Sequence, residues 1–453
     1  MDMKEKIAEL LEQKIYAGLT EYLSAETPQD IAQALSDLDE EQILVAYRVL
    51  PKETAAEVFV EMPPEEQEML IKTFSDAQLK LLLDEMYMDD TVDIIEEMPA
   101  NVVKRILRSS DPEARKQINE LLHYPEDSAG SIMTTEYVTL RENMTVEEAL
   151  LRIRRTGIDK ETVYTCYVTS PARVLLGVVS VKDLLVASDD QIVGDIMDTH
   201  VIYANTNEDK EDVVKEMAKY DFLAMPVVDK EKRLVGIVTL DDAVDVLTDE
   251  ATEDIEKMAA IVPSDKPYLR TGVFETWRKR IPWLLLLMVS ATFTGQIITG
   301  FEAALASSVA LTAFIPMLMD TGGNAGSQAS VTIIRGLALG EIEMKDVFRV
   351  IWKELRVALM CGAVLSVCNF GKIMLVDNLI FGNDVPVNVA VVVCLTIIVT
   401  IFFSKLVGST LPMIAKRLGF DPAVMASPFI TTIVDALSLL VYFGIATVVI
   451  TNL

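Results

Sequence analysis

Hydrophobic residues are distributed very differently in the two parts of this chain. From residue 271 onward, long apolar runs carry few charges. Their lengths match the roughly 20 residues that a helix needs to cross a bilayer. We therefore expect an all-α membrane domain with five helices. The predicted spans cover residues 281–301, 303–320, 350–376, 385–404 and 422–453.

The first 130 residues have the pattern of short amphipathic helices. Apolar residues recur every three or four positions, with polar residues between them. Pro51, Pro63 and Pro99 lie where helices are expected to begin, a position that proline tolerates well. The similar phrases LPKE, MPPEE and MPAN recur there. We predict a repeated helix–turn unit and hence a solenoid-like helical domain over residues 1–130.

The next part of the chain contains an internal duplication. IMTTEYVTLRENMTVEEAL is echoed by IMDTHVIYANTNEDKEDVV 64 positions later, and LGVVSVKDLL by VGIVTLDDAV 59 positions later. Each copy has the pattern strand, helix, strand, strand, helix. Because the two echoes differ in phase by five residues, the first copy should carry an insertion, near residues 157–164. We predict two α/β domains, 131–190 and 191–248.

An acidic helix is expected directly after the second copy. Like charges at helical spacing destabilise an isolated helix, so such a stripe needs solvent or bound cations. We assign residues 249–275 to this connecting helix and its linker, and residues 276–453 to the membrane domain. The stripe is formed by Asp242, Asp245, Asp249 and Glu253, with Glu250 and Asp254 beside it.

Charge separates the same two parts of the chain. Residues 1–270 hold 58 acidic and 28 basic residues, a net charge of −30, whereas residues 271–453 hold 11 acidic and 12 basic residues, a net charge of +1. An acidic surface repels nucleic acid and attracts divalent cations, so we expect no nucleic-acid partner. A merely solubilising surface is the alternative, and the clustering of the acids disfavours it.

Few side chains can serve as soft metal ligands. The chain has four cysteines without a CxxC pair and only two histidines, which argues against a disulfide framework or a zinc site. Oxygen ligands dominate and favour hard cations such as Mg²⁺ or Ca²⁺. No nucleophile–base pair or phosphate-binding loop points to an enzyme.

Basic residues predict the orientation in the membrane. The clusters at residues 278–280, 335–356 and 416–417 fall on one side if the N-terminus is inside and the C-terminus outside. Lys372 is the exception. The polar start of the chain lacks the apolar core of a secretory signal. We therefore expect the acidic domains in the cytoplasm, attached to an inner or plasma membrane.

One carboxylate lies inside the last apolar run. Thirteen uncharged residues precede Asp435 and 18 follow it. A charge at membrane depth costs at least ~2.5 kcal/mol on insertion scales and usually faces a bundle interior or a water path. The two interpretations are a structural hydrogen bond and a cation site in a pore. Ser427, Thr431 and Ser438 share its helical face, which suits a hydrated divalent ion.

The second span runs into the glycine-rich segment DTGGNAGSQ. We expect Gly322, Gly323 and Gly326 to interrupt the helix, and irregular backbone at this depth occurs where it lines a cavity or is buried in protein. Asn324 and Gln328 would add amide oxygens. A cation-binding loop and a tight interhelical turn are both compatible with this spacing.

These segments carry a resemblance to a known family. TGGNAGSQ, DEATEDI and PFITTIVDALSLLVYF resemble the MgtE family of magnesium channels and transporters, as does the order of helical domain, tandem CBS domains, acidic helix and five spans. The resemblance implies a homodimer whose pore, on the two-fold axis, is lined by the second and fifth spans. It implies that Asp435 holds a hydrated Mg²⁺. Ser427 departs from the asparagine of a better-known relative, which puts the outer contacts of the ion in doubt.

The resemblance also implies Mg²⁺ sites between the acidic cytosolic domains. The corresponding acids lie in the helical domain, the second CBS domain, the connecting helix and the start of the last span. They are Glu57, Asp89, Asp93, Asp209, Glu211, Asp221, Asp242, Asp245, Glu250, Glu253, Asp254 and Asp421.

Each CBS copy carries a Gly-x-x-Ser/Thr-x-x-Asp pattern that resembles an adenosine-ribose site. ATP binding is one interpretation, and an ordinary strand-to-helix turn with a capping residue is the other. The residues are Gly177, Ser180 and Asp183 in the first copy, and Gly236, Thr239 and Asp242 in the second.

Together these features predict a Mg²⁺-selective channel or transporter that closes when cytosolic Mg²⁺ is high and bound between the acidic domains. One alternative is a transporter of another divalent cation, Mn²⁺ or Co²⁺. Another is a membrane-anchored nucleotide-sensing protein whose spans serve only as an anchor. Asp435 disfavours the anchor, because an anchor has no use for a buried carboxylate.

Overall fold

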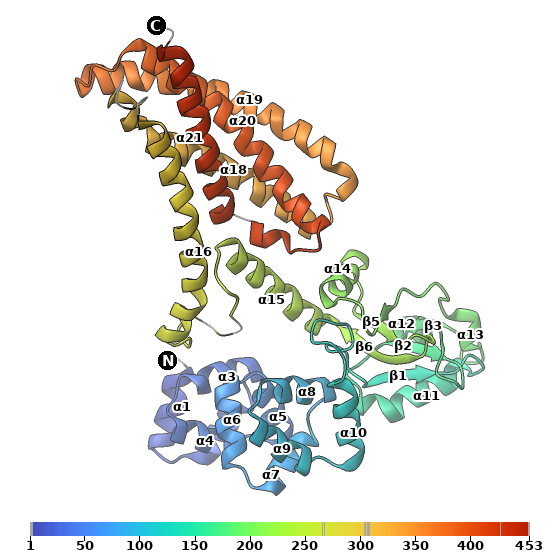
Figure 1. Cartoon of the computed structure of the whole chain (residues 1–453). Helices are drawn as coiled ribbons and strands as arrows, with labels where there is room; N and C mark the ends of the chain where they lie inside the picture. The colour runs from blue at the N-terminus through green and yellow to red at the C-terminus, as the bar shows by residue number, and fades with distance from the viewer. Residues whose placement is uncertain are drawn as a thin grey trace. The chain divides into compact units, whose positions relative to one another are not determined.

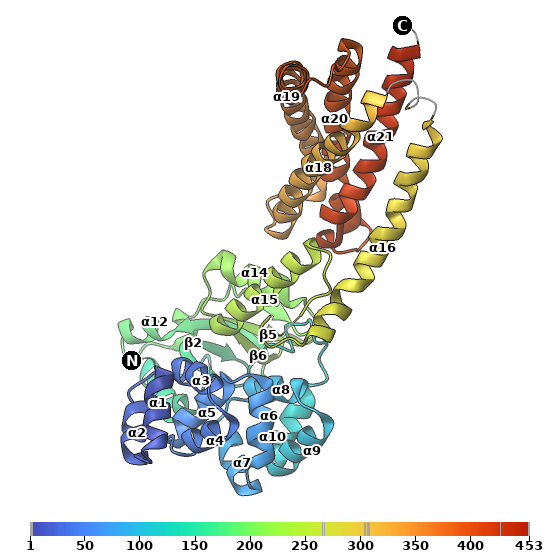
Figure 2. The same cartoon turned by 90° about the vertical axis from the view of Figure 1, so that its left-hand side faces the viewer.

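The computed structural model describes residues 3–451 except 265, 267, 303–304, 306–308 and 426. The chain divides into two units, residues 1–247 and 248–453, and each is described by itself. Figures 1 and 2 show their elements in two views at 90°.

The first unit begins with a helical domain built from short helices. Odd-numbered helices stack in sequence, α1 on α3, α3 on α5, α5 on α7 and α7 on α9, which confirms the solenoid-like prediction. Pro51, Pro63 and Pro99 occupy the N-cap positions of α5, α6 and α9, as expected. The helices are α1 (Met3–Glu12), α2 (Tyr16–Leu23), α3 (Pro28–Ser36), α4 (Glu40–Arg48), α5 (Lys52–Val60), α6 (Pro64–Thr73), α7 (Asp76–Leu83), α8 (Met88–Glu97), α9 (Ala100–Ser109) and α10 (Pro112–Leu121).

Two sheets of identical topology follow and confirm the internal duplication. In each sheet the first strand pairs parallel with the second, which pairs antiparallel with the third. The register also repeats, because Val168 pairs with Gly177 and Val227 with Gly236. The elements are β1 (Tyr137–Leu140), α11 (Val146–Thr156), β2 (Thr162–Thr169), β3 (Leu175–Ser180), α12 (Val181–Val186), α13 (Val193–Ile196), β4 (Ala204–Asn205), α14 (Lys210–Tyr220), β5 (Ala224–Val228), β6 (Leu234–Thr239) and α15 (Leu240–Met258).

The insertion in the first copy lies where the phase shift predicts it. A short 3₁₀ helix, η1 (Gly157–Asp159), separates α11 from β2, whereas α14 and β5 are joined without such an element. The insertion brings Glu161 to the residue just before β2.

The second unit contains the end of α15 and the long apolar helices. Four helices in the described part of the chain are long and apolar enough to cross a membrane: Val273–Gly300, Met344–Ile380, Val387–Arg417 and Pro422–Val449. These confirm the membrane helices, and the count of five stays a prediction. The elements are α16 (Val273–Gly300), η2 (Val309–Phe314), α18 (Ile315–Ala338), η3 (Met344–Asp346), α19 (Val347–Lys372), the π-helix η4 (Ile373–Ile380), α20 (Val387–Arg417), η5 (Pro422–Met425) and α21 (Ser427–Thr451).

The predicted second span is wrong in its bounds and in its glycine-rich end. Several of its first residues lie outside the described residues, and the helix α18 begins only at Ile315. It continues without interruption through the glycines, so neither the cation-binding loop nor the tight turn forms. Tertiary contact overrides the low helix propensity of glycine here.

Close packing explains these glycines. A Cβ atom on Gly322 would lie 2.7 Å from Ser438 Oγ of α21, and one on Gly326 would lie 2.9 Å from Ile430 Cγ2. A Cβ atom on Gly408 of α20 would overlap the carbonyl oxygen of Gly326. Small residues let membrane helices approach closely and gain packing contacts. The glycines therefore fix α18 against both α20 and α21.

A buried ion pair joins α19 to α20. Lys405 Nζ lies 3.5 Å from Glu354 Oε2, and both residues are less than a tenth exposed. The sequence analysis missed this pair because no local pattern joins Glu354 to Lys405, which lie on different helices. Removing one partner of a buried pair leaves an uncompensated charge, which is far more costly than losing the pair.

We expect Lys405→Met to destabilise the membrane domain by about 3–5 kcal/mol, because Glu354 is then buried without a partner. The double variant Glu354→Met/Lys405→Met should recover most of that loss. Unfolding of the detergent-solubilised full chain by heat or SDS measures both. Arg349→Met, which breaks the exposed pair with Asp346, is the control and should cost less than about 1 kcal/mol. A double variant no more stable than Lys405→Met would contradict the assignment.

Candidate cation sites

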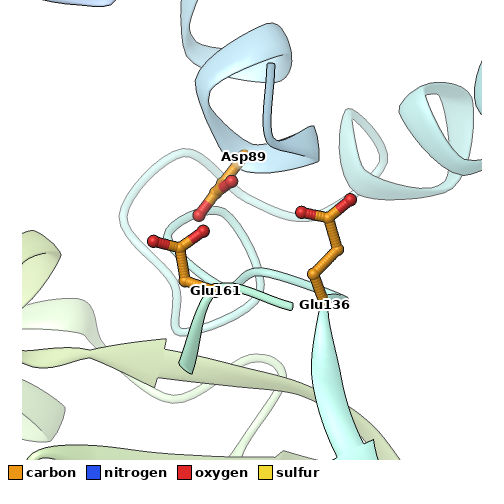
Figure 3. Close-up of side chains that lie close together, drawn as sticks. All are labelled: Asp89, Glu136 and Glu161. Carbon is orange, nitrogen blue, oxygen red and sulfur yellow. The ribbon is translucent and has the colours of Figure 1, made fainter. Parts of the chain in front are cut away.

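Three carboxylates of the first unit converge on one space. One carboxylate oxygen each from Asp89, Glu136 and Glu161 lies within 4.8 Å of the others, and the side chains point toward one another (Figure 3). Asp89 is only 9 % exposed, and its Oδ1 accepts no hydrogen bond in the described part of the chain. We call these residues, with Asp90 and Asp242, the Asp89 cluster.

Secondary structure brings the three side chains together. Asp89 belongs to the first turn of α8. Glu136 and Glu161 each precede one of the parallel strands β1 and β2, and the backbone N–H of Glu161 donates to the carbonyl of Glu136 at 3.0 Å. Since parallel strands begin at the same edge of a sheet, both glutamates face α8 from that edge.

Burial and mutual repulsion raise the pKa values in the Asp89 cluster. Desolvation is the first cause and neighbouring carboxylates add to it. The pKa of Asp89 lies well above its ordinary value, that of Asp90 rises to about 7 and that of Glu161 to about 8. Asp242 rises to about 6, because its burial outweighs the 2.5 Å hydrogen bond that the Thr239 hydroxyl donates to it. Hard oxygen donors of this kind suit Mg²⁺.

A hollow of about 400 Å³ adjoins the cluster. Glu57 lines it together with Glu53, Asp90 and Glu136. Asp93 is exposed on α8, and its charge interacts with those of Asp242 and Asp90. The structure thus brings Glu57, Asp89, Asp93 and Asp242 into one acidic region, and their role as metal ligands stays a prediction.

Sequence reasoning missed three members of this region, Asp90, Glu136 and Glu161. Glu161 lies inside the insertion that the phase shift located, so an extra acid in that insertion was a usable signal. Glu136 carried no such signal, because only the pairing of β1 with β2 places it beside Glu161.

Three predicted metal ligands make contacts within α14 or at its ends. Asp209 is the N-cap of α14 and accepts the backbone N–H of Glu211 at 2.9 Å. Glu211 forms an ion pair with Lys215 at 2.5 Å. Asp221 ends α14 in the left-handed region with φ 55°, which aspartate tolerates better than most residues. None of these contacts joins the three residues to the Asp89 cluster.

A lysine lies between two predicted metal ligands of the second unit. Lys257 Nζ lies 2.7 Å from Glu253 and 2.7 Å from Asp421. Burial lowers the pKa of Lys257, but the hydrogen bonds and charges of Asp421 and Glu253 outweigh it and raise that pKa above its ordinary value. The ammonium group therefore bridges two carboxylates that the resemblance implies as metal ligands. Asp245, Glu250 and Asp254 lie on the same helix, α15, and each has interactions of its own.

Asp435 lies within α21, beside the glycines of α18. Its Oδ1 is buried and accepts no hydrogen bond among the described residues, which argues against a structural hydrogen bond at that atom. Thr431 packs on Gly323, and the Ser438 hydroxyl donates to the backbone carbonyl of Val434 at 2.7 Å. Ser438 is buried against Gly322, and the Ser427 side chain lies outside the described residues. Asn324 is exposed on α18.

The CBS pattern forms a capping box in the first copy and a single side-chain bond of the same kind in the second. Ser180 donates to Asp183 at 2.5 Å and accepts the Asp183 backbone N–H, while Thr239 donates to Asp242 at 2.5 Å. Gly177 and Gly236 allow close crossing of backbones, because a Cβ atom on either would lie 2.9 Å from a carbonyl oxygen, that of Asp198 or Thr134. The capping interpretation accounts for all of these contacts.

Apolar helices, a carboxylate with a buried oxygen among them and a separate acidic part are typical of membrane transporters for cations. Residues 315–445 match the family model described as divalent cation transporter. Residues 26–127 match the MgtE intracellular N domain, and residues 129–190 and 193–249 match the CBS domain. The chain belongs to the MgtE family.

Similar proteins support this assignment over nearly the whole chain. The magnesium transporter MgtE of Thermus thermophilus is 39% identical over 98% of each chain. That of Bacillus subtilis is 35% identical, covering 94% of this chain and 92% of the relative. The solved cytosolic domain of the Mg²⁺ channel MgtE in complex with ATP is 41% identical, with a TM-score of 0.52, over 54% of this chain and 100% of that one.

The raised pKa values predict a pH dependence in metal-free protein. The folded state holds protons that the unfolded state has released, so the contact between α8 and the sheet should weaken as pH rises from about 4 toward about 8. We expect hydrogen exchange in α8 to accelerate at least about tenfold relative to intrinsic rates across that window. Mass spectrometry measures it, and Mg²⁺ at pH 8 should restore protection.

Glu161→Gln removes one of these charges and should flatten the pH dependence. Glu113→Gln, an exposed acid on α10, is the matched control and should leave it unchanged. If Glu161→Gln and the unsubstituted protein show the same pH dependence, the electrostatic account of the cluster fails.

Proposed function

We propose that this chain forms a Mg²⁺-selective channel or transporter of the cell membrane. The proposal rests on Asp435, which lies in the apolar helix α21. Its buried Oδ1 accepts no hydrogen bond from the described residues. A carboxylate in that position is stabilised by a cation that passes it. The relatives named magnesium transporter MgtE support Mg²⁺ as the ion.

The path lies between two copies of the chain in this proposal. One chain supplies one Asp435, and Mg²⁺ commonly keeps several waters and binds through one or two carboxylates. A two-fold axis beside α18 and α21 supplies two copies of Asp435. In this proposal the domains of the first 248 residues lie in the cytoplasm and the C-terminus lies outside, which the distribution of basic clusters supports.

Internal Mg²⁺ closes the path by binding between acidic surfaces. Two unit charges about 4 Å apart repel by roughly 4 kcal/mol at an effective dielectric near 20. The Asp89 cluster holds several carboxylates at comparable separations. Mg²⁺ would be held there by Asp89, Glu136 and Glu161, and it would favour the compact state over the splayed one. Such a population shift requires that the ion bind one state better than the other.

Lys257 neutralises Glu253, one of the acids of α15. It forms ion pairs with both Glu253 and Asp421, and these pairs hold the end of α15 near the start of the last membrane helix. Gating by Mg²⁺ then depends on the other acids of the helix, among them Asp242, Asp245 and Glu250.

ATP is a further ligand of the CBS domains in this proposal. The complex of the similar cytosolic domain with ATP supports it. Asp183 and Asp242 would contact the ribose through carboxylate oxygens, in addition to their capping bonds to Ser180 and Thr239.

We expect Asp435→Asn to reduce Mg²⁺ flux by at least about tenfold, because losing more than 1.4 kcal/mol of cation stabilisation has that effect. Uptake into proteoliposomes holding a Mg²⁺-sensitive dye measures the flux. Asp384→Asn, in the segment between η4 and α20, is the control and should retain it. Undiminished flux in Asp435→Asn would refute the transport proposal, and faster flux of Mn²⁺ or Co²⁺ than of Mg²⁺ would refute the selectivity.

The gating proposal predicts a loss of inhibition when four acids of α15 are neutralised. In Asp242→Asn/Asp245→Asn/Glu250→Gln/Asp254→Asn, the internal Mg²⁺ concentration for half-inhibition should rise at least about tenfold. Patch recordings with controlled internal Mg²⁺ measure it.

A control with equal net charge separates this effect from general electrostatics. It neutralises four exposed acids elsewhere in the first unit and should retain normal inhibition. If both quadruple variants respond alike, α15 is not the sensor. The control positions are Glu12, Glu113, Glu147 and Glu231.

A further inference from the structure

Helix α18 presents a polar stripe that its neighbours leave exposed. Asp320, Asn324 and Gln328 follow at intervals of four residues, and all three are exposed in the described structure. The glycines on the other side of the helix are buried against α20 and α21. A carboxylate followed by two amides is not stable against lipid tails. The stripe must therefore face water or another copy of the chain.

The stripe begins beside the carboxylate of the proposed path. The charges of Asp320 and Asp435 interact, and they come from two helices in direct contact. The contacts of the glycines fix how the helices run: Gly322 meets Ser438, whereas Gly326 meets Ile430. The two helices are therefore antiparallel, and Asp320 lies about one helical turn beyond Asp435, toward the C-terminal end of α21.

The sequence analysis assigned Asp320 to the end of the second span, where a charge is unremarkable. The start of α18 at Ile315 changes that assignment. Asp320 now occupies the second turn of a 24-residue helix that is packed against the last membrane helices.

We propose that Asp320 is a second cation-binding residue of the conduction path and that it sets the preference for divalent over monovalent ions. The inference rests on the proposed function. In a path on a two-fold axis, Asp320 and Asp435 form two levels of paired carboxylates, one turn apart. A divalent ion neutralises such a pair, whereas a monovalent ion leaves net charge behind.

Two levels also suit conduction. Ions must bind well enough to enter and weakly enough to leave, and adjacent sites achieve both when an ion at one level repels an ion at the next. Asn324 and Gln328 continue the same face with amide oxygens, which can accept hydrogen bonds from the water shell of a hydrated ion. With the C-terminus outside, Asp320 lies on the external side of Asp435 and meets incoming ions first.

Flux measurements on Asp320→Asn test the inference. We expect the Mg²⁺ concentration for half-maximal flux to rise at least about fivefold, equivalent to about 1 kcal/mol, and Na⁺ to permeate better relative to Mg²⁺. Asp320→Glu keeps the charge and should restore both. Asp320→Asn/Asn324→Asp moves the charge by one turn along the stripe and should restore them in part.

The outcomes separate this inference from the transport proposal. If Asp435→Asn abolishes flux while Asp320→Asn changes neither affinity nor ion preference, only the present inference is overturned. If Asp435→Asn keeps its flux, the transport proposal fails first. A changed dimer population by light scattering, with unchanged affinity per active dimer, would assign Asp320 to the subunit contact instead and overturn the inference. Should Asp320→Asn fail to assemble, Asp320→Ser is measured instead: a half-maximal Mg²⁺ concentration raised at least about fivefold supports the inference, and an unaltered one overturns it.

Discussion

A carboxylate taken out of water needs a cation, and this constraint organises both units of the molecule. In the described part of the chain, lysines supply that cation at several carboxylates. Lys405 neutralises Glu354 between α19 and α20, and Lys257 lies between Glu253 and Asp421. A lysine is a permanent partner because it is covalently attached. Such contacts need no ion from the solution, so they contribute to the scaffold.

In two other places the described part of the chain provides no ion pair. Asp89 is buried among acids, with an oxygen that accepts no hydrogen bond there, and Asp435 has an oxygen in the same condition within an apolar helix. Their free energy then depends on what the solution contains. At the Asp89 cluster this dependence would make a sensor, and at Asp435 it would make a path for the ion. Lysine partners thus stabilise the fold, whereas carboxylates that depend on dissolved cations are the candidates for sensing and transport.

Local patterns predicted most of the fold, and contacts between distant residues account for the errors. The prolines at helix starts and the two echoed segments specify the helical and CBS domains, because helix caps and strand alternation are local properties. The glycines of α18 misled the prediction, since their role depends on Ser438, Ile430 and Gly408 from other helices. Glu136 was missed for the same reason, because strand pairing alone places it beside Glu161.

The glycines and the polar stripe of α18 are two consequences of one geometric problem. A helix that lines a path must turn polar groups toward it and still be held firmly by its neighbours. Glycine lets the neighbouring helices hold α18 firmly, because without a side chain its backbone contacts them directly. The face with Gly322 and Gly326 packs on α20 and α21, which leaves the face with Asp320 and Asn324 exposed and available to the proposed ion path. The glycine-rich segment therefore does not break the helix. It lets α18 pack closely on one face and present polar side chains on the other.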